Sequence, residues 1–263
     1  MLLMRYVHIF LTCLQEVFAE RSEQIVWLLL SCINPLLMML FWQGASTIPG
    51  WTGSAILSYY ILIITAGAFL MPHPEDHVAV RDIQEGGLSV YLLKPFSYFW
   101  LKFYNAFAYR MISGVFSLFI LLIFFFFLPG LLQVSTSPFL LLMSFFIGIN
   151  AFLLAFSFKM IIGLFAFWFI EIRGLFEVLD ATLTIFAGYL MPISLFPHWL
   201  ANIAYVLPFP YMIYFPVIAF EGKLSVEELL RVIGIQIIWL CIFYVLYQKV
   251  WQAGIKKYSA VGQ

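Results

Sequence analysis

Apolar residues gather into long runs along this chain, separated by short polar segments. A run of about twenty apolar residues is long enough to cross the hydrocarbon core of a bilayer as a helix. Such runs lie at residues 25–42, 55–71, 98–128, 138–170, 175–191 and 232–247. The pattern predicts an all-α integral membrane protein with six transmembrane helices, forming a single transmembrane domain over residues 1–263.

Residues 1–23 follow a different pattern. Their polar side chains recur every three to four residues and draw one polar stripe along an otherwise apolar helix. A helix of this kind lies in the membrane interface, so we expect an interfacial helix here, with a badly formed first span as the alternative. Glu16, Glu20, Arg21 and Glu23 stand where a signal peptide would be cleaved, which argues against one.

Two apolar runs do not fit one straight crossing. Residues 138–170 would form a helix of about 50 Å, so this run is either tilted or leaves the bilayer at its polar end. Residues 192–220 contain five prolines, too many for one regular helix. We expect two short helices there that dip back into the membrane against protein or a water-filled cavity. This re-entrant region includes Pro192, Phe196, Pro197, Trp199, Pro208, Pro210 and Pro216.

Composition supports the membrane assignment and argues against several functions. Apolar residues make up 64% of the 263 residues and charged residues 10%, against about 25% charged residues in soluble domains. Basic and acidic residues balance at 13 each, which gives no indication of nucleic-acid binding. The sequence has no P-loop motif, so we expect no ATP site on this chain. The three cysteines form no CxxC pair, which argues against a thiolate metal site.

Lysine and arginine are unequally distributed between the two sides of the predicted topology. With six spans, the side that holds both termini receives nine of them and the other side receives two. Cytoplasmic loops carry the excess of basic residues, so we expect both termini to be cytoplasmic. The nine are Arg5, Arg21, Arg81, Lys94, Lys102, Arg173, Lys249, Lys256 and Lys257, and the two are Lys223 and Arg231.

Arg110 and Lys159 lie inside predicted spans. An ionisable group at this depth faces the protein interior or a wet cavity and is a functional candidate. For each residue, a structural role such as snorkelling or an ion pair and a role in a substrate path fit the sequence equally well. Asp180 is a candidate counter-ion. One helical face, which should pack inward, carries Lys102, Ala106, Arg110, Ser113 and Ser117.

Two further groups of polar residues have a stronger structural interpretation. Asn34, in the first span, is a candidate for the substrate path, but Asn34, Asn150, Thr65 and Thr182 fit interhelical hydrogen bonds better. His73 and His77 flank two carboxylates, which resembles a metal pair on a helix. The start of a helix in a cytoplasmic loop, with Pro74 in its first turn, explains them better. We therefore expect neither a metal nor a catalytic residue.

Three features in sequence order, which together cover nearly the whole chain, resemble the permease subunits of type-2 ABC exporters, the group with daunorubicin- and viologen-resistance permeases. The first is the amphipathic N-terminal helix. The second is RDIQEGGLSVYLLKP at residues 81–95, which is similar to the family segment G-x-L-x-x-L-L-x-x-P between spans two and three. The third is the proline-rich run over residues 188–216. The fourth apolar run departs from the family pattern because Lys159 interrupts it.

The resemblance implies an ATP-driven exporter in the inner or plasma membrane. Two permease subunits, identical or homologous, would pair, and each would rest its cytoplasmic loop, residues 72–97, on a separate ATP-binding subunit. ATP and Mg would bind that partner, so this chain would bind no cofactor and catalyse no reaction. The re-entrant region, residues 192–220, would be extracellular. The residues expected to couple to the ATPase are Arg81, Asp82, Ile83, Glu85, Gly86, Gly87 and Leu88.

A path lined by Phe, Leu, Met and Tyr would suit hydrophobic or amphipathic cargo, such as drugs, lipids or lipid-linked glycans, with multidrug efflux as one such activity. A stand-alone secondary transporter is the alternative, and it would predict internal repeats and acids at mid-membrane, whereas the acids here cluster at span ends. A lipid-modifying membrane enzyme is a third hypothesis, and the only candidate for its catalytic cluster is the group of polar residues around His73 and His77. Candidate path residues are Arg110, Ser113, Ser117, Asn34 and Lys159.

Overall fold

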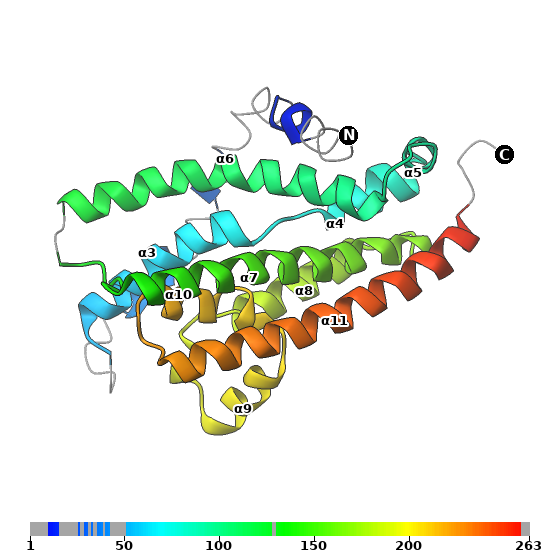
Figure 1. Ribbon diagram of the computed structural model, residues 1–263. Helices are drawn as coiled ribbons and strands as arrows, with labels where there is room; N and C mark the ends of the chain where they lie inside the picture. Colours follow the sequence, from blue (N-terminus) through cyan, green and yellow to red (C-terminus); the bar gives the residue numbers. More distant parts are fainter. Residues whose placement is uncertain are drawn as a thin grey trace.

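The computed structural model describes residues 10–15, 26, 29–30, 33, 36–38, 40–42, 51–127 and 130–258 (Figure 1). Helices are the only regular elements within these ranges, which confirms the predicted all-α class. The α-helices are α3 (Gly53–Leu70), α4 (Glu75–His77), α5 (Leu88–Leu92), α6 (Tyr98–Phe127), α7 (Pro138–Leu164), α8 (Arg173–Phe186), α9 (His198–Val206), α10 (Tyr214–Phe220) and α11 (Val226–Lys257). A π-helix, η1, spans Val78–Gln84, and short 3₁₀ helices are η2 (Phe165–Phe167), η3 (Ile193–Leu195) and η4 (Phe209–Tyr211).

Four helical segments are long and apolar enough to cross a membrane: Gly53–Gln84, Tyr98–Phe127, Pro138–Phe167 and Val226–Lys257. A fifth is reached if the pair His198–Val206 and Phe209–Phe220, bent by 70°, is counted as one span. The chain is therefore a multi-pass membrane protein, but six spans are not confirmed. The predicted fifth span is α8, whose 14 residues measure about 21 Å, shorter than a hydrocarbon core of about 30 Å.

The predicted N-terminal elements are described only in part. Residues 10–15 are helical, and Phe10 and Cys13 pack against Ala108 and Ile112 of α6. The described residues between 26 and 42 are helical as well. The remainder of the predicted interfacial helix and of the first span, including Asn34, lies outside the described residues.

Helix α7 lies at the centre of the bundle. It runs beside α11 along most of its length and also contacts α10, while α6 packs on α3 as an outer layer (Figure 1). The long apolar run that begins at Pro138 stops being helical after Phe167. The largest fully buried side chains include Tyr59, Tyr60 and Phe156. Large apolar side chains lie exposed on the outer faces, as expected of surfaces that face lipid; Phe126 of α6, for example, is 73% exposed.

Long-range hydrogen bonds define the two ends of this bundle. At one end the Gln84 side chain donates to the Ile170 carbonyl (2.7 Å) and the Tyr258 hydroxyl donates to the Gly86 carbonyl (2.9 Å). This end, here the basic end, carries Arg81, Lys94, Lys102, Arg173, Lys249, Lys256 and Lys257. At the opposite end, Gln133 N donates to Ser58 Oγ (2.9 Å) and Ser135 N donates to the Phe220 carbonyl (3.0 Å).

The small and polar face predicted on α6 packs inward. Lys102, Ala106, Ser113 and Ser117 are all buried, and Arg110 is half-buried. The face lies against α3, where Gly114 leaves room for the Phe69 ring. This prediction is confirmed, and it explains why a helix with apolar residues on every other side keeps one polar stripe.

The proline-rich region forms short helices, as predicted. Its prolines stand at helix starts, where a missing N–H costs no hydrogen bond: Pro192, Pro197 and Pro208 precede η3, α9 and η4, and Pro216 lies in the first turn of α10. The 70° bend falls between α9 and the segment that begins at Phe209. Phe196 is buried, whereas Trp199 is 66% exposed.

Two tyrosines of α3 anchor the connection between α8 and this region. The Tyr59 hydroxyl donates to the Gly188 carbonyl and the Tyr60 hydroxyl donates to the Leu190 carbonyl, both at 2.8 Å. Trp42 Nε1 donates to the same Leu190 carbonyl at 3.3 Å. Gly188 has a φ of +96°, which favours glycine, and a Cβ there would meet the Tyr59 hydroxyl.

Candidate functional site

The predicted coupling segment is built into the bundle rather than lying free of it. After a break at 71–74, the backbone continues as α4 and η1, and both contact α7. Two buried ion clusters hold this segment. We name them the Lys159 cluster (His73, Glu75, Lys159 and Asp180) and the Lys102 cluster (His77, Asp82, Tyr98 and Lys102).

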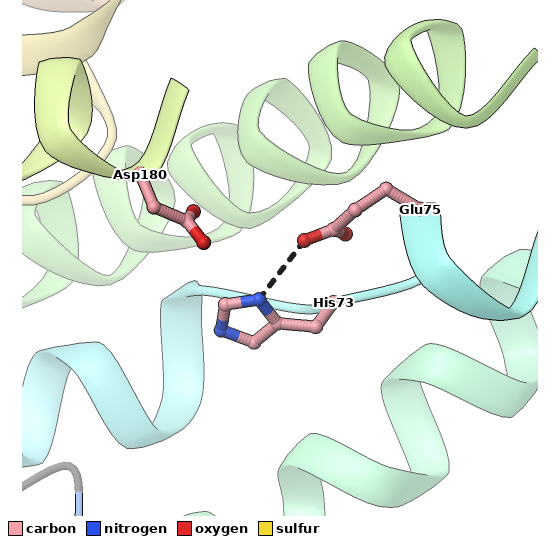
Figure 2. A group of neighbouring side chains, drawn as sticks. All are labelled: His73, Glu75 and Asp180. Carbon is pink, nitrogen blue, oxygen red and sulfur yellow. Dashed lines mark hydrogen bonds and ion pairs between the residues drawn. The ribbon is translucent and has the colours of Figure 1, made fainter. Parts of the chain in front are cut away.

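The Lys159 cluster joins the segment to α7 and α8. Lys159 Nζ donates to Glu75 Oε1 (2.8 Å) and also approaches Asp180 Oδ1 (3.4 Å), which confirms Asp180 as a counter-ion. His73 Nδ1 lies 2.7 Å from Lys159 Nζ and 3.1 Å from Glu75 Oε1. His73 Nδ1 therefore accepts a hydrogen bond from Lys159 in one tautomer or donates one to Glu75 in the other. Figure 2 shows the side chains of His73, Glu75 and Asp180 pointing toward one another, with the contact between His73 and Glu75 as a dashed line.

The Lys159 cluster is desolvated at its core and open at its margin. The side chains of Lys159 and Glu75 are 4% and 9% exposed, whereas that of Asp180 is 57% exposed. Glu75 Oε2 is buried and has no hydrogen-bond partner among the described residues. The negative charge of Glu75 is therefore balanced mainly by the Lys159 ammonium. This pairing matters because an unpaired buried charge is strongly destabilising.

The same three acceptors resemble a metal-binding set. The ligand atoms of His73, Glu75 and Asp180 lie within 4.8 Å of one another. The ammonium of Lys159 already lies within 3.4 Å of all three atoms and so occupies the place of a cation. His77 belongs to the other cluster, so the two histidines of the sequence motif do not converge.

The Lys102 cluster joins the segment to α6. Lys102 Nζ lies 2.6 Å from Asp82 Oδ2 and 3.0 Å from His77 Nδ1, and the Tyr98 hydroxyl donates to Asp82 Oδ2. The ammonium also lies over the Tyr91 ring, 4.5 Å from its centroid. Asp82 and Lys102 are almost fully buried. Asp82 is therefore positioned to hold α6, not to face solvent.

The π-helix explains why Asp82 points inward. The wider i→i+5 turn is closed by the bond from Glu85 N to the Val80 carbonyl (2.9 Å). In this arrangement Asp82 and Ile83 are buried while Arg81 and Glu85 are exposed. Gly86, with φ of +83°, then turns the chain into α5, and its carbonyl accepts from Ser89 and Tyr258. Of the remaining coupling candidates, Leu88 is fully buried and Gly87 half-buried.

The candidate path residues do not share one surface. Ser113 and Ser117 are buried, and each hydroxyl donates to a carbonyl of its own helix. Lys159 belongs to the ion cluster. Arg110 alone of the described candidates lines a cleft of about 940 Å³ between α3, α6, α7 and α10.

The sequence pattern missed the acids that pair with the buried lysines. Glu75 and Asp82 lie in what reads as a solvated polar segment, although a lysine inside an apolar run requires a buried counter-ion. The sequence therefore indicates that a buried acid must pair with each lysine, but it does not identify which acid forms the pair. The interhelical hydrogen bonds predicted for Thr65 and Thr182 are wrong, because each hydroxyl donates to the carbonyl four residues earlier in its own helix.

Comparison with known proteins agrees with this architecture. Residues 28–262 match a family profile described as ABC-2 family transporter protein. No curated protein matches the chain significantly. The profile covers most of the chain, including the segment held by both ion clusters and the bent pair of helices. The chain therefore belongs to the ABC-2 transporter family, as a multi-pass membrane component of such a transporter.

Proposed function

We propose that this chain is the permease subunit of an ATP-driven exporter. It pairs with a second permease subunit, which is a copy of this chain or a homologue, and with ATP-binding subunits that carry ATP and Mg. Its cargo is hydrophobic or amphipathic, such as a drug, a lipid or a lipid-linked glycan. The closer likeness to the daunorubicin- and viologen-resistance group is part of this proposal.

One observation carries the proposal. The segment from Glu75 to Leu92 consists of short helices joined by a turn at residues 85–87; buried ion pairs fasten it to α6 and α7, and it still presents Arg81 and Glu85 to solvent. A surface that receives mechanical work from a soluble ATPase needs both properties: exposed groups to contact the partner and a firm attachment to the spans.

The attachment gives a route for movement. Asp82 transmits a displacement of the segment to α6 through Lys102, and Glu75 transmits it to α7 through Lys159. Charge pairs in a low-dielectric interior resist separation more strongly than pairs in water. We therefore assign contact with the ATPase to Arg81 and Glu85, and a positioning role to Asp82.

The basic end is the cytoplasmic end in this proposal. Seven lysines and arginines of the described spans and connections gather there: Arg81, Lys94, Lys102, Arg173, Lys249, Lys256 and Lys257. The opposite end carries Lys223 and Arg231. This asymmetry favours both termini in the cytoplasm and the bent pair α9–α10 on the extracellular side.

Isolation of the tagged chain from its native membrane in mild detergent tests the proposal. We expect an ATP-binding subunit to co-purify, with or without a second permease. Glu85→Lys should release that subunit while the chain still inserts at its normal level. Glu227→Lys, on a side chain 86% exposed at the opposite end, is the charge-matched control and should retain the subunit.

Two results would contradict the proposal. The chain arriving alone, under conditions that keep related complexes intact, favours a secondary transporter or a lipid-modifying enzyme, since neither needs an ATP-binding partner. Loss of chain from the membrane in Glu85→Lys, but not in Glu227→Lys, makes the segment structural and removes its assigned contact with the ATPase.

A further inference from the structure

The cleft beside Arg110 has no role in the proposed function. Its volume of about 940 Å³ lies within the range of about 300–1,000 Å³ typical of sites for drug-sized ligands. Apart from Arg110, its walls are almost entirely apolar, with Phe103, Phe107 and Phe152 at one end and Pro216 and Phe220 at the other.

The cleft opens on the outer surface of the bundle. Four residues at its rim are 38–65% exposed: Met111 and Leu118 on α6, and Phe145 and Ile149 on α7. These faces belong to helices long and apolar enough to cross the membrane, so bilayer lipids can reach the opening. Hydrocarbon chains can enter from the bilayer without crossing water.

Arg110 is the charge that this cleft leaves without a partner. Within the ranges that the structure describes, no hydrogen bond or ion pair reaches its guanidinium, and the Tyr109 ring lies 5.6 Å from Cζ to the ring centroid. The neighbouring acid, Glu75, is already paired with Lys159. A charge beside apolar walls is costly unless a counter-charge is supplied.

The position of Arg110 along α6 suits a lipid headgroup. Arg110 lies 12 residues after Tyr98, so its Cα is about 18 Å along the helix from the basic end. Side chains on a helix lean toward its N-terminus, which brings the guanidinium back toward the headgroup layer of that leaflet. Tyr104, nearer the basic end, lines the same cleft.

We propose that this cleft binds a bilayer lipid with an anionic phosphate headgroup. Arg110 contacts the phosphate, and one or more acyl chains lie between α6 and α7. A guanidinium matches phosphate oxygens in a bidentate geometry, and the apolar walls favour a lipid over a soluble anion. The site does not depend on the ATP-binding partner.

Photocrosslinking in nanodiscs tests this proposal without ATP. The full chain is labelled with phosphatidylglycerol or with phosphatidylcholine, each bearing a diazirine on one acyl chain, and labelled peptides are identified by mass spectrometry. We expect labelling of α6 and α7 peptides that is about tenfold stronger with phosphatidylglycerol, the factor expected for one charged contact. Arg110→Gln should reduce it to the phosphatidylcholine level.

A second pair of variants keeps the test independent of folding defects at Arg110. Gly148 lines the cleft, and a Cβ there meets only Leu70 Cδ2, at 3.9 Å, so Gly148→Leu should fill the cleft and abolish labelling by both lipids. Gly234→Leu, the matched control, introduces the same side chain into open space on α11 and should label as the unmodified chain.

Three outcomes would overturn the proposal. They are equal labelling by the two lipids that Arg110→Gln does not change, labelling that Gly148→Leu leaves intact, and labelling that excess inorganic phosphate removes. The last would identify a site for soluble phosphate. Because no ATP or ATP-binding subunit takes part, these outcomes are independent of the proposed exporter function.

Discussion

The two ends of the bundle are held by different chemistry. At the basic end, single lysines of α6 and α7 pair with buried acids of the preceding segment, as Lys102–Asp82 and Lys159–Glu75. At the opposite end, neutral donors reach backbone carbonyls over residues 188–190. A few strong ion pairs therefore hold the helices together at the basic end, whereas several weaker hydrogen bonds hold them at the opposite end. Loss of one ion pair at the basic end should therefore cost much stability, whereas loss of one hydrogen bond at the opposite end should cost little.

The largest expected effect is at the Lys159 cluster. Lys159→Met leaves the Glu75 carboxylate buried without its main partner, and removing one member of a buried pair costs about 3–5 kcal/mol. We expect a correspondingly large fall in the thermal unfolding temperature of the detergent-solubilised protein, measured by intrinsic fluorescence.

The double variant Glu75→Gln/Lys159→Met is the control for the Lys159 prediction. It removes both charges, and replacing a whole buried pair by uncharged groups is often close to neutral, so it should recover most of the lost stability. A double variant no more stable than Lys159→Met alone would mean that packing, rather than charge, holds α7 to the segment.

Asp82→Asn tests the second attachment and should have a smaller effect. Lys102 loses its carboxylate partner but keeps His77 at 3.0 Å and the Tyr91 ring at 4.5 Å. We expect a loss of about 1.5–3 kcal/mol in the free energy of unfolding, the range for a hydrogen bond to a charged group.

The same variant separates structure from coupling. If Asp82 positions the segment, Asp82→Asn should weaken the stimulation of ATPase activity by cargo while the ATP-binding subunit still co-purifies. Release of that subunit, as expected for Glu85→Lys, would instead place Asp82 in the contact itself.

The sequence predicted the parts of the fold that depend on periodicity and on local backbone chemistry. Apolar runs identified α3, α6, α7 and α11 as spans, because length and hydropathy alone decide whether a helix can cross a bilayer. Prolines at 192, 197 and 208 predicted interrupted helices, since a missing N–H acts locally. The inward face of α6 followed from its spacing of small and polar residues.

The rest depends on contacts between distant residues. Glu75 and Lys159 are 84 positions apart, and nothing in the composition around Glu75 distinguishes it from an exposed acid of a loop. The inward turn of Asp82 depends on the π-helix, whose extra residue per turn changes which side chains face α6. The length of α8 was overestimated because its apolar run continues past Phe186 into a turn at Gly188.

Two tyrosine variants test how much each hydrogen bond contributes to stability at the opposite end. Tyr59→Phe leaves the Gly188 carbonyl without its hydroxyl donor, and we expect a loss of about 1–2 kcal/mol. Tyr60→Phe should cost less, about 0.5–1 kcal/mol, because Trp42 still donates to the Leu190 carbonyl. Thermal unfolding of both variants in one detergent checks which loses more stability. A larger loss in Tyr60→Phe would show that the hydrogen bond from Trp42 does not compensate for the lost hydroxyl.

The smallest expected effect is a pH dependence at the opposite end. Burial raises the pKa of Glu221, although Lys223 Nζ, 2.8 Å from its carboxylate, acts in the other direction. The folded protein then binds this proton more tightly than the unfolded chain. The contribution of Glu221 to stability is complete below the ordinary pKa of a glutamate, near 4.3, and falls as the pH rises through the higher folded pKa.

Glu221→Gln should flatten this part of the profile of unfolding temperature against pH, while Glu227→Gln, on a side chain 86% exposed, should leave it unchanged. An unaltered slope in Glu221→Gln would mean that the ion pair with Lys223 fully offsets the effect of burial on this pKa, and that even at this end a charge pair carries part of the attachment.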